Sequence, residues 1–136
     1  MILIDTGPIV AAAAPRDSRH AECVDLLSRL PEPPVISPFV ATEVCYFLST
    51  RATPAAEAAF LRSIAVGTFQ LADLTDLDMI RCAELVERYD DLPLGAADAS
   101  VIALAERLVI TTVITLDRRH FSVVRPRHVD ALELLP

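Results

Sequence analysis

Short apolar segments alternate along this chain with longer segments of helical periodicity, and this alternation restricts the fold more than any other feature. The clearest strand is predicted over residues 109–117, VITTVITLD, where β-branched side chains are dense. Residues 2–5, ILID, lack the alternation of a half-exposed strand, so we expect a short and fully buried one. Strands separated by single or paired helices favour an α/β, three-layer sandwich in which helices flank a mainly parallel central sheet.

The remaining elements follow from the same patterns. Further strands are expected over residues 35–37, 69–74 and 131–135. Helices are expected over residues 8–14, 19–30, 39–51, 54–66, 76–89 and 96–108. A chain of 136 residues with 53% hydrophobic side chains can build one core, and no repeat or linker divides it. We therefore expect a single domain over residues 1–136.

The charged residues exclude several classes of function. A formal net charge of −7 argues against a general nucleic-acid coat, which carries a basic excess. All 12 basic residues are arginine, and without lysine the chain can be neither a Schiff-base enzyme nor a Walker A nucleotide-binding protein. The chain has only 3 glycines, at positions 7, 67 and 95, so it contains no GxGxxG dinucleotide-binding loop.

The cysteines and the apolar stretches indicate a cytoplasmic protein. Cys23, Cys45 and Cys82 are odd in number and form no CxxC pair, so we expect buried, reduced thiols. The longest apolar stretches are far shorter than the roughly 20 residues of a membrane span. No basic segment precedes Ile2, so a signal peptide is not expected either.

Two predicted strands end in an acidic residue, Asp5 and Asp117. Ligands of open parallel sheets bind beyond the carboxyl ends of the strands, so neighbouring strands would place both acids at one edge. Asp98 opens the helix before the second of these strands and also lies near a sheet edge. Glu43 stands inside an apolar helix, where burying a carboxylate is costly unless a cation or hydrogen bonds compensate for it.

Each of the first three acids also has a purely structural explanation. Asp5 could cap the helix that follows it, Asp98 could favour the dipole of its own helix, and Asp117 could start a turn. Glu43 is harder to explain in this way, because its neighbours are apolar. The structural explanations would have to hold independently, whereas one shared site accounts for all four acids.

Four converging carboxylates without a lysine suggest a site for a divalent cation with oxygen ligands. Mg²⁺ or Mn²⁺ suits such ligands, while zinc would favour histidine and cysteine. Carboxylates clustered without a cation would repel one another and raise their pKa values. The chemistry that such a site implies is phosphodiester hydrolysis by metal-activated water.

Four segments of the sequence together resemble the PIN-domain nucleases. They are LIDTG at residues 3–7, TEV at 42–44, GAADA at 95–99 and TLDRRHF at 115–121. More narrowly, their order and spacing are similar to the VapC toxins of bacterial type II toxin–antitoxin pairs, and the resemblance covers essentially the whole chain. It implies a PIN-like fold and an Mg²⁺- or Mn²⁺-dependent endoribonuclease that cleaves structured cellular RNA of the tRNA or rRNA class.

The resemblance also implies roles for particular residues and partners. Four residues match the acidic quartet of the family, and the first and third of them match its principal metal ligands: Asp5, Glu43, Asp98 and Asp117. Thr115 matches a hydroxyl position that supports such sites, with β propensity as the alternative explanation, and Thr6 could support Asp5. A cognate antitoxin protein and a second copy of the chain are the implied protein partners.

Binding of an acidic substrate requires positive charge, and arginines follow the predicted strand end at Asp117. The candidates for contacts to RNA phosphates are Arg118, Arg119, Arg125, Arg127 and, near the first helix, Arg16. The alternative for the four arginines after Asp117 is an ordinary solvated turn. His120 is expected to pack or to form hydrogen bonds rather than to act as a general acid.

Two other classes of function remain open at the level of sequence. A phosphotransfer or receiver-like domain also places acids at strand ends, but such domains use a lysine that this chain lacks. A catalytically silent PIN-like binding module is the second alternative, and an intact set of four acids argues against it.

Overall fold

Five parallel strands and seven helices make up the chain in a computed structural model that describes residues 1–136. The strands are β1 (Leu3–Ile4), β2 (Val35–Ile36), β3 (Gln70–Leu71), β4 (Thr112–Ile114) and β5 (Glu133–Leu135). The helices are α1 (Thr6–Ala13), α2 (His20–Ser28), α3 (Pro38–Arg51), α4 (Pro54–Ala65), α5 (Asp76–Arg88), α6 (Ala96–Leu108) and α7 (Arg118–Val123). The predicted α/β class is confirmed. The sheet was expected to be mainly parallel, and all of its strand pairs are parallel.

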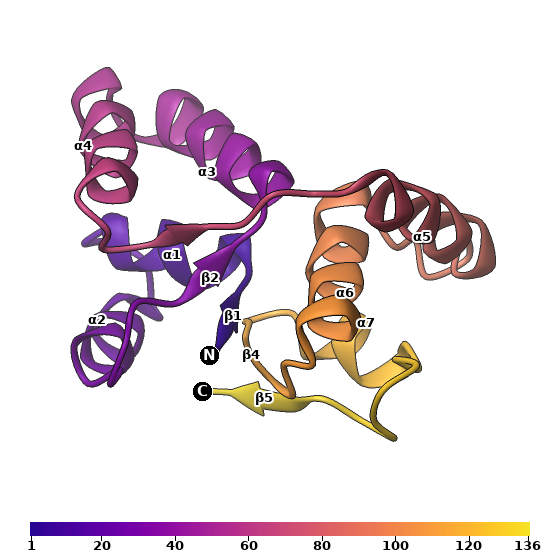
Figure 1. The fold of residues 1–136 in the computed structure, drawn as a ribbon. Coiled ribbons are helices and arrows are strands. Elements are labelled where there is room, and N and C mark those ends of the chain that lie inside the picture. The colour runs from indigo at the N-terminus through magenta and orange to yellow at the C-terminus, as the bar shows by residue number, and fades with distance from the viewer.

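The strand order β3-β2-β1-β4-β5 places β1 at the centre of the sheet. The connections from β1 to β2 and from β2 to β3 step outward in one direction, and those from β3 to β4 and from β4 to β5 step in the other. Because such crossovers are right-handed, the two sets of helices cover opposite faces of the sheet. Figure 1 shows α1 to α4 on one side and α5 to α7 on the other. This is the predicted three-layer sandwich.

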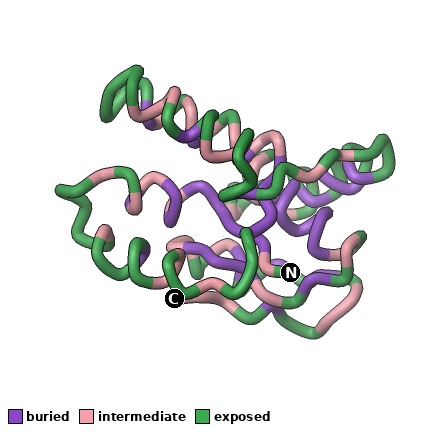
Figure 2. The backbone as a smooth tube through the Cα atoms, turned by 60° about the vertical axis from the view of Figure 1, so that its left-hand side comes forward, coloured by how far each residue is buried: buried purple, intermediate pink, exposed green.

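The hydrophobic core lies on and around the central strands. Leu3, Ile4, Val113 and Ile114 are fully buried and belong to a cluster of 25 buried side chains. The same burial is visible in Figure 2, where the buried stretches run through the middle of the molecule and the helices carry exposed outer faces. Burial on both faces explains why Leu3–Ile4 and Val113–Ile114 are consecutive apolar pairs in the sequence. None of the helices combines the length and the apolar character that crossing a membrane would require.

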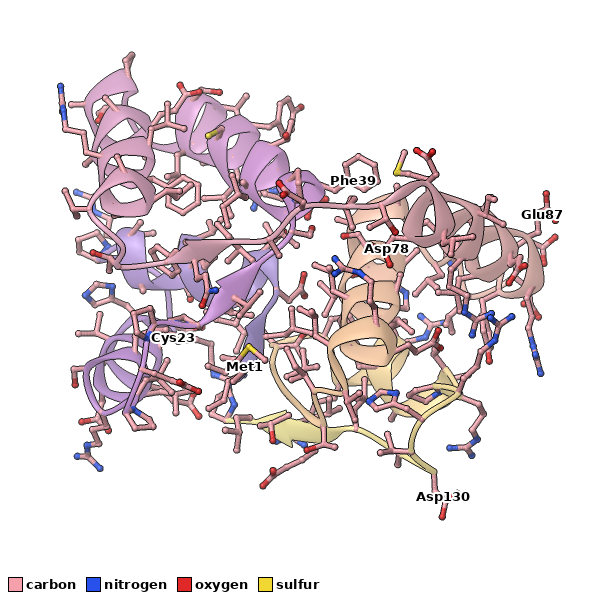
Figure 3. All side chains as sticks on the ribbon, viewed as in Figure 1. Met1, Cys23, Phe39, Asp78, Glu87 and Asp130 are labelled. Atoms are coloured by element: carbon pink, nitrogen blue, oxygen red, sulfur yellow. The ribbon has the colours of Figure 1, made fainter.

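Buried and half-buried ion pairs join α5 to α6. The Arg81 guanidinium donates two hydrogen bonds to the Glu106 carboxylate, at 2.8 and 2.9 Å, and both side chains are 11% exposed. Arg107 donates to Asp78 at 2.8 Å. Figure 3 shows Asp78 in the space between the two helices, whereas Glu87 points away from them into solvent. These pairs fix the helix that carries Asp98 at its N-terminus.

The structure corrects several element boundaries. The strand predicted over residues 109–117 is only Thr112–Ile114, and the one predicted over residues 69–74 is only Gln70–Leu71. A helix, α7, replaces the turn considered after Asp117: the Asp117 side chain caps it by accepting a hydrogen bond from the His120 amide at 3.1 Å. A run of β-branched residues therefore overstated the strand at both ends, and a side-chain cap decided the structure after it.

The three cysteines are free thiols, as expected. Cys23 and Cys82 are buried, while Cys45 is only half-buried, so the expectation of three buried thiols is wrong for Cys45. Burial raises the pKa of the Cys82 thiol to about 11, which makes it a weak nucleophile.

The backbone conformation of Val109 indicates a position at which a substitution should stabilise the fold. It follows α6 with φ of 56°, a left-handed conformation that is strained for a β-branched residue, and its side chain is 71% exposed. Val109→Gly should raise the free energy of unfolding by about 1 kcal/mol, because glycine adopts this conformation without strain. Urea unfolding measures the change.

Val66 provides the matched control for this substitution. It occupies the equivalent position after α4, is 80% exposed and has φ of −92°. Val66→Gly should not stabilise the protein, because no strain is relieved there. Equal effects of the two glycine substitutions would contradict the assignment of strain to Val109.

Candidate metal centre

Asp5 stands at the carboxyl end of the central strand and is 5% exposed. Its backbone amide extends the pairing of β1 with β4 by donating to the Ile114 carbonyl at 2.9 Å. One carboxylate oxygen, Oδ1, accepts a hydrogen bond from the Thr6 amide at 2.7 Å and so caps α1, while Oδ2 accepts one from Thr115 Oγ1 at 3.0 Å. The capping role considered for Asp5 is therefore confirmed. The carboxylate that caps α1 also lies at the carboxyl edge of the sheet.

The two threonines considered as supporting residues contact the acids directly. Thr115 Oγ1 donates to Asp5 and accepts a hydrogen bond from the Asp117 amide at 2.9 Å, so this buried hydroxyl joins the ends of β1 and β4. Thr6 Oγ1 donates to the Oε2 atom of Glu43 on α3. Glu43 is half-buried rather than enclosed among its apolar neighbours, because its face of α3 opens on a pocket.

Asp98 and Asp117 meet at a histidine from α7. His120 Nδ1 lies 3.1 Å from Asp98 Oδ2 and 2.9 Å from Asp117 Oδ2. One ligand atom from each of the three residues lies within 4.8 Å of those of the other two, a spacing at which one metal ion could be bound. The expectation that His120 forms hydrogen bonds agrees with these contacts. Sequence reasoning did not place it in the site, because its helix was not predicted.

All four acids line one pocket of about 490 Å³ at the carboxyl edge of the sheet. Five further residues that the sequence analysis did not select also line the pocket: Val10 from α1, Phe47 and Arg51 from α3, and Asp17 and Leu116 from loops. The strands that Asp5 and Asp117 follow, β1 and β4, are adjacent and parallel. Both acids therefore lie at one edge of the sheet, as predicted.

The clustering of carboxylates alters their acidity. Burial, followed by the charge of Asp98, raises the pKa of Asp5 from 3.8 to about 7, although its hydrogen bonds from Thr6 and Thr115 oppose the rise. Burial also raises the pKa of Asp98, and the adjacent His120 works against that rise. A buried carboxylate that resists ionisation beside other acids is a group whose charge a bound cation would stabilise.

The donor set fits a hard divalent cation. Carboxylate oxygens dominate the pocket, as Mg²⁺ and Mn²⁺ prefer. The imidazole of His120, which contacts two of these acids, is also compatible with Mn²⁺. No cysteine lines the pocket, and a structural zinc site would need more nitrogen or sulfur ligands.

The five arginines predicted to contact RNA lie outside the lining of this pocket. Arg118 donates hydrogen bonds to the carbonyls of Leu134 and Pro136 at the end of the chain. Arg127 pairs with Glu84 at 2.9 Å. The side chains of the others are exposed, and their contacts with RNA stay a prediction: Arg16, Arg119 and Arg125.

Residues 2–125 match the PIN domain family. Ribonuclease VapC26 of Mycobacterium tuberculosis is 38% identical over 128 residues, which are 92% of this chain and 93% of that protein. The chain belongs to the PIN-domain family. The resemblance carried by its four short segments is thereby confirmed.

The solved structures similar to this PIN domain share its whole fold. VapC20 of Mycobacterium tuberculosis, described as a sarcin–ricin loop cleaving toxin, superimposes with a TM-score of 0.83 at 22% identity, over 96% of this chain and 99% of that one. VapBC2 from Rickettsia felis, bound to a DNA fragment from its promoter, gives a TM-score of 0.67 at 20% identity, over 98% and 97%. FitAcB from Neisseria gonorrhoeae gives 0.68 at 17% identity, over 100% and 97%.

The raised pKa of Asp5 predicts how the stability of the metal-free PIN domain depends on pH. Between about pH 4 and 7 the folded protein holds a proton on Asp5 that the unfolded chain has released, so stability falls as pH rises through this range. Each unit of pKa difference corresponds to about 1.4 kcal/mol. Asp5→Asn cannot ionise, so it should flatten this fall and be more stable than the wild type near pH 8.

Urea unfolding in EDTA across this pH range measures the effect. Asp98 has a raised pKa too, so some pH dependence should persist in Asp5→Asn. Asp90→Asn, at an exposed loop acid, is the control and should follow the wild-type curve. Parallel curves for Asp5→Asn and the wild type would contradict the raised pKa.

Proposed function

We propose that this protein is a metal-dependent endoribonuclease that acts as the toxin of a toxin–antitoxin pair. The observation that carries the proposal is the convergence of Asp5, Glu43, Asp98 and Asp117 on one pocket in a PIN domain. The ribonuclease VapC26, at 38% identity over most of both chains, supports RNA as the substrate. The description of VapC20 as a sarcin–ricin loop cleaving toxin supports structured RNA of the tRNA or rRNA class.

Asp5 and Asp98 are the proposed principal ligands of Mg²⁺ or Mn²⁺, with Asp117 and Glu43 completing the site. Their carboxylates face one pocket from a strand end, from the first turn of α6 and from α3. The cation would supply positive charge for the scissile phosphate and Lewis acidity for the attacking water.

The other polar residues of the site position these carboxylates. Thr115 holds Asp5 and the Asp117 backbone together, and Thr6 restrains Glu43. His120 fills the space between Asp98 and Asp117 and contacts both. Because each acid is held by a hydrogen bond before substrate arrives, little reorganisation is left for the reaction itself.

An apolar pocket supports the proposed antitoxin partner. It measures about 410 Å³, and residues of α1 to α4 with Phe69 line it. Nine of its ten lining residues are hydrophobic. Such a groove fits the apolar face of a peptide segment from another protein. Pairing of two copies of this chain stays a prediction.

Loss of one ligand tests the nuclease. Asp98→Asn should abolish RNA cleavage, a fall of at least about a hundredfold, because removal of electrostatic stabilisation in an active site costs this much or more. The assay is gel electrophoresis of a ribosomal RNA fragment incubated with Mn²⁺, and circular dichroism verifies that the variant is folded. Asp90→Asn should cleave like the wild type.

The cleavage assay tests one alternative function, and a labelling experiment tests the other. A silent binding module would cleave no RNA, whereas a nuclease should lose cleavage in EDTA and regain it with Mn²⁺. A receiver-like domain would be labelled covalently by a small phosphoryl donor, which we do not expect. Full activity of Asp98→Asn would disprove the assignment.

His120 is a proposed positioning residue, and two substitutions distinguish its hydrogen bond from its bulk. Asparagine can place an N–H close to the position of Nδ1, whereas leucine fills similar space without a donor. His120→Leu should weaken Mn²⁺ binding about tenfold, as loss of a group that orients metal ligands typically does. His120→Asn should retain most of the affinity.

Isothermal titration with Mn²⁺ measures these affinities without substrate. Glutamine, whose amide lies nearer the Nε2 position, is the further control and should behave like leucine. Wild-type affinity in His120→Leu would show that the histidine only packs against the two carboxylates.

A further inference from the structure

The pocket extends from the acids along one face of α3. Glu43, Phe47 and Arg51 all line it, and their spacing of four residues aligns them in a row along the helix. From the first to the third of these positions the helix rises about 12 Å. The row therefore leads from an acid of the candidate metal centre to an arginine at the last residue of α3.

Arg51 is the only basic residue that lines this pocket, and five acids share the lining with it. Its guanidinium carbon lies 4.4 Å from the centre of the Phe47 ring, a cation–π contact that holds the side chain against the helix. It forms no ion pair with a carboxylate of the chain. Its hydrogen-bond donors are thus available on a side chain that is already oriented.

This combination distinguishes Arg51 from the arginines near α7. Arg118 is engaged with backbone carbonyls, and Arg127 is paired with Glu84, so each has partners within the protein. Neither lines the acidic pocket. A phosphodiester chain that enters the pocket meets five carboxylates, which repel it. Apart from a cation bound by these acids, the guanidinium of Arg51 is the one positive charge in the lining that attracts it.

We propose that Arg51, held by Phe47, forms a binding subsite for a backbone phosphate of the substrate RNA next to the phosphate that is cleaved. The planar guanidinium suits phosphate, to which it can donate two parallel hydrogen bonds. This subsite rests on the proposed nuclease function. An RNA backbone bound there would run along α3 toward Glu43. It adds a residue that binds substrate without touching the reacting atoms.

Arg51→Gln tests the subsite, and Arg88→Gln is its matched control. Arg88 is likewise the last residue of its helix, α5, is exposed, and stacks on an aromatic neighbour, with its guanidinium carbon 5.6 Å from the Tyr89 ring centre. It lies outside the acidic pocket. Both substitutions are made in the Asp98→Asn protein, so that RNA is bound without being cut.

The probe is a fluorescently labelled ribosomal RNA hairpin, and fluorescence anisotropy gives its Kd over a range of salt concentrations. Arg51→Gln should weaken binding about tenfold, the size expected for one lost charge-assisted hydrogen bond. It should also lower the slope of log Kd against log salt by about 0.7 to 0.9, the contribution of one phosphate contact. Arg88→Gln should change neither quantity.

Arg51→Lys separates charge from packing. Lysine keeps the positive charge but loses the planar stack, so it should restore most of the salt dependence while regaining only part of the affinity. Equal behaviour of the Arg51→Gln and Arg88→Gln proteins would overturn the proposal, as would no measurable binding of the hairpin by the Asp98→Asn protein. RNA cleavage by the wild type decides separately whether the nuclease function stands.

Discussion

The parallel pairing of β1 with β4 is the interaction on which the rest of the site depends. Leu3 pairs with Val113 and Ile4 with Ile114, and the Asp5 amide continues the ladder to the Ile114 carbonyl. These four paired side chains are fully buried, so packing fixes the register of the two strands. The acid that follows β1 and the turn that follows β4 are consequently held at one edge, where Thr115 joins them.

A cluster of carboxylates at a sheet edge costs stability, and the structure shows how that cost is limited. Hydrogen bonds from Thr6 and Thr115 favour the ionised form of Asp5, but burial and the charge of Asp98 outweigh them and leave its pKa at about 7. His120 offsets part of the same effect at Asp98. The metal-free site is therefore strained electrostatically, and a cation would relieve that strain. This balance of hydrogen bonding and repulsion is typical of functional sites rather than of structural ones.

The sequence predicted the features that depend on local patterns. The apolar runs located the strands, capping residues and prolines located the helices, and the rule for sheet edges brought Asp5 and Asp117 together. It failed where one side chain or a distant contact decides the outcome. The Asp117 cap converts a predicted strand end and turn into α7, and only that helix brings His120 to Asp98. The arginines after Asp117 looked close to the site in sequence, but α7 and the end of the chain hold Arg118 elsewhere. The spacing of Glu43, Phe47 and Arg51 was visible, yet its meaning required knowing which face of α3 opens on the pocket.

The central claim is that the acids at this sheet edge form one metal site, and the location of a bound ion tests it most directly. Crystals soaked in Mn²⁺ and measured near the manganese absorption edge would give an anomalous difference map. The account predicts a peak about 2.0–2.3 Å from carboxylate oxygens of both Asp5 and Asp98, a distance typical of a hard cation on oxygen ligands. A map without a peak in this pocket, or with its only peak elsewhere on the protein, would contradict it.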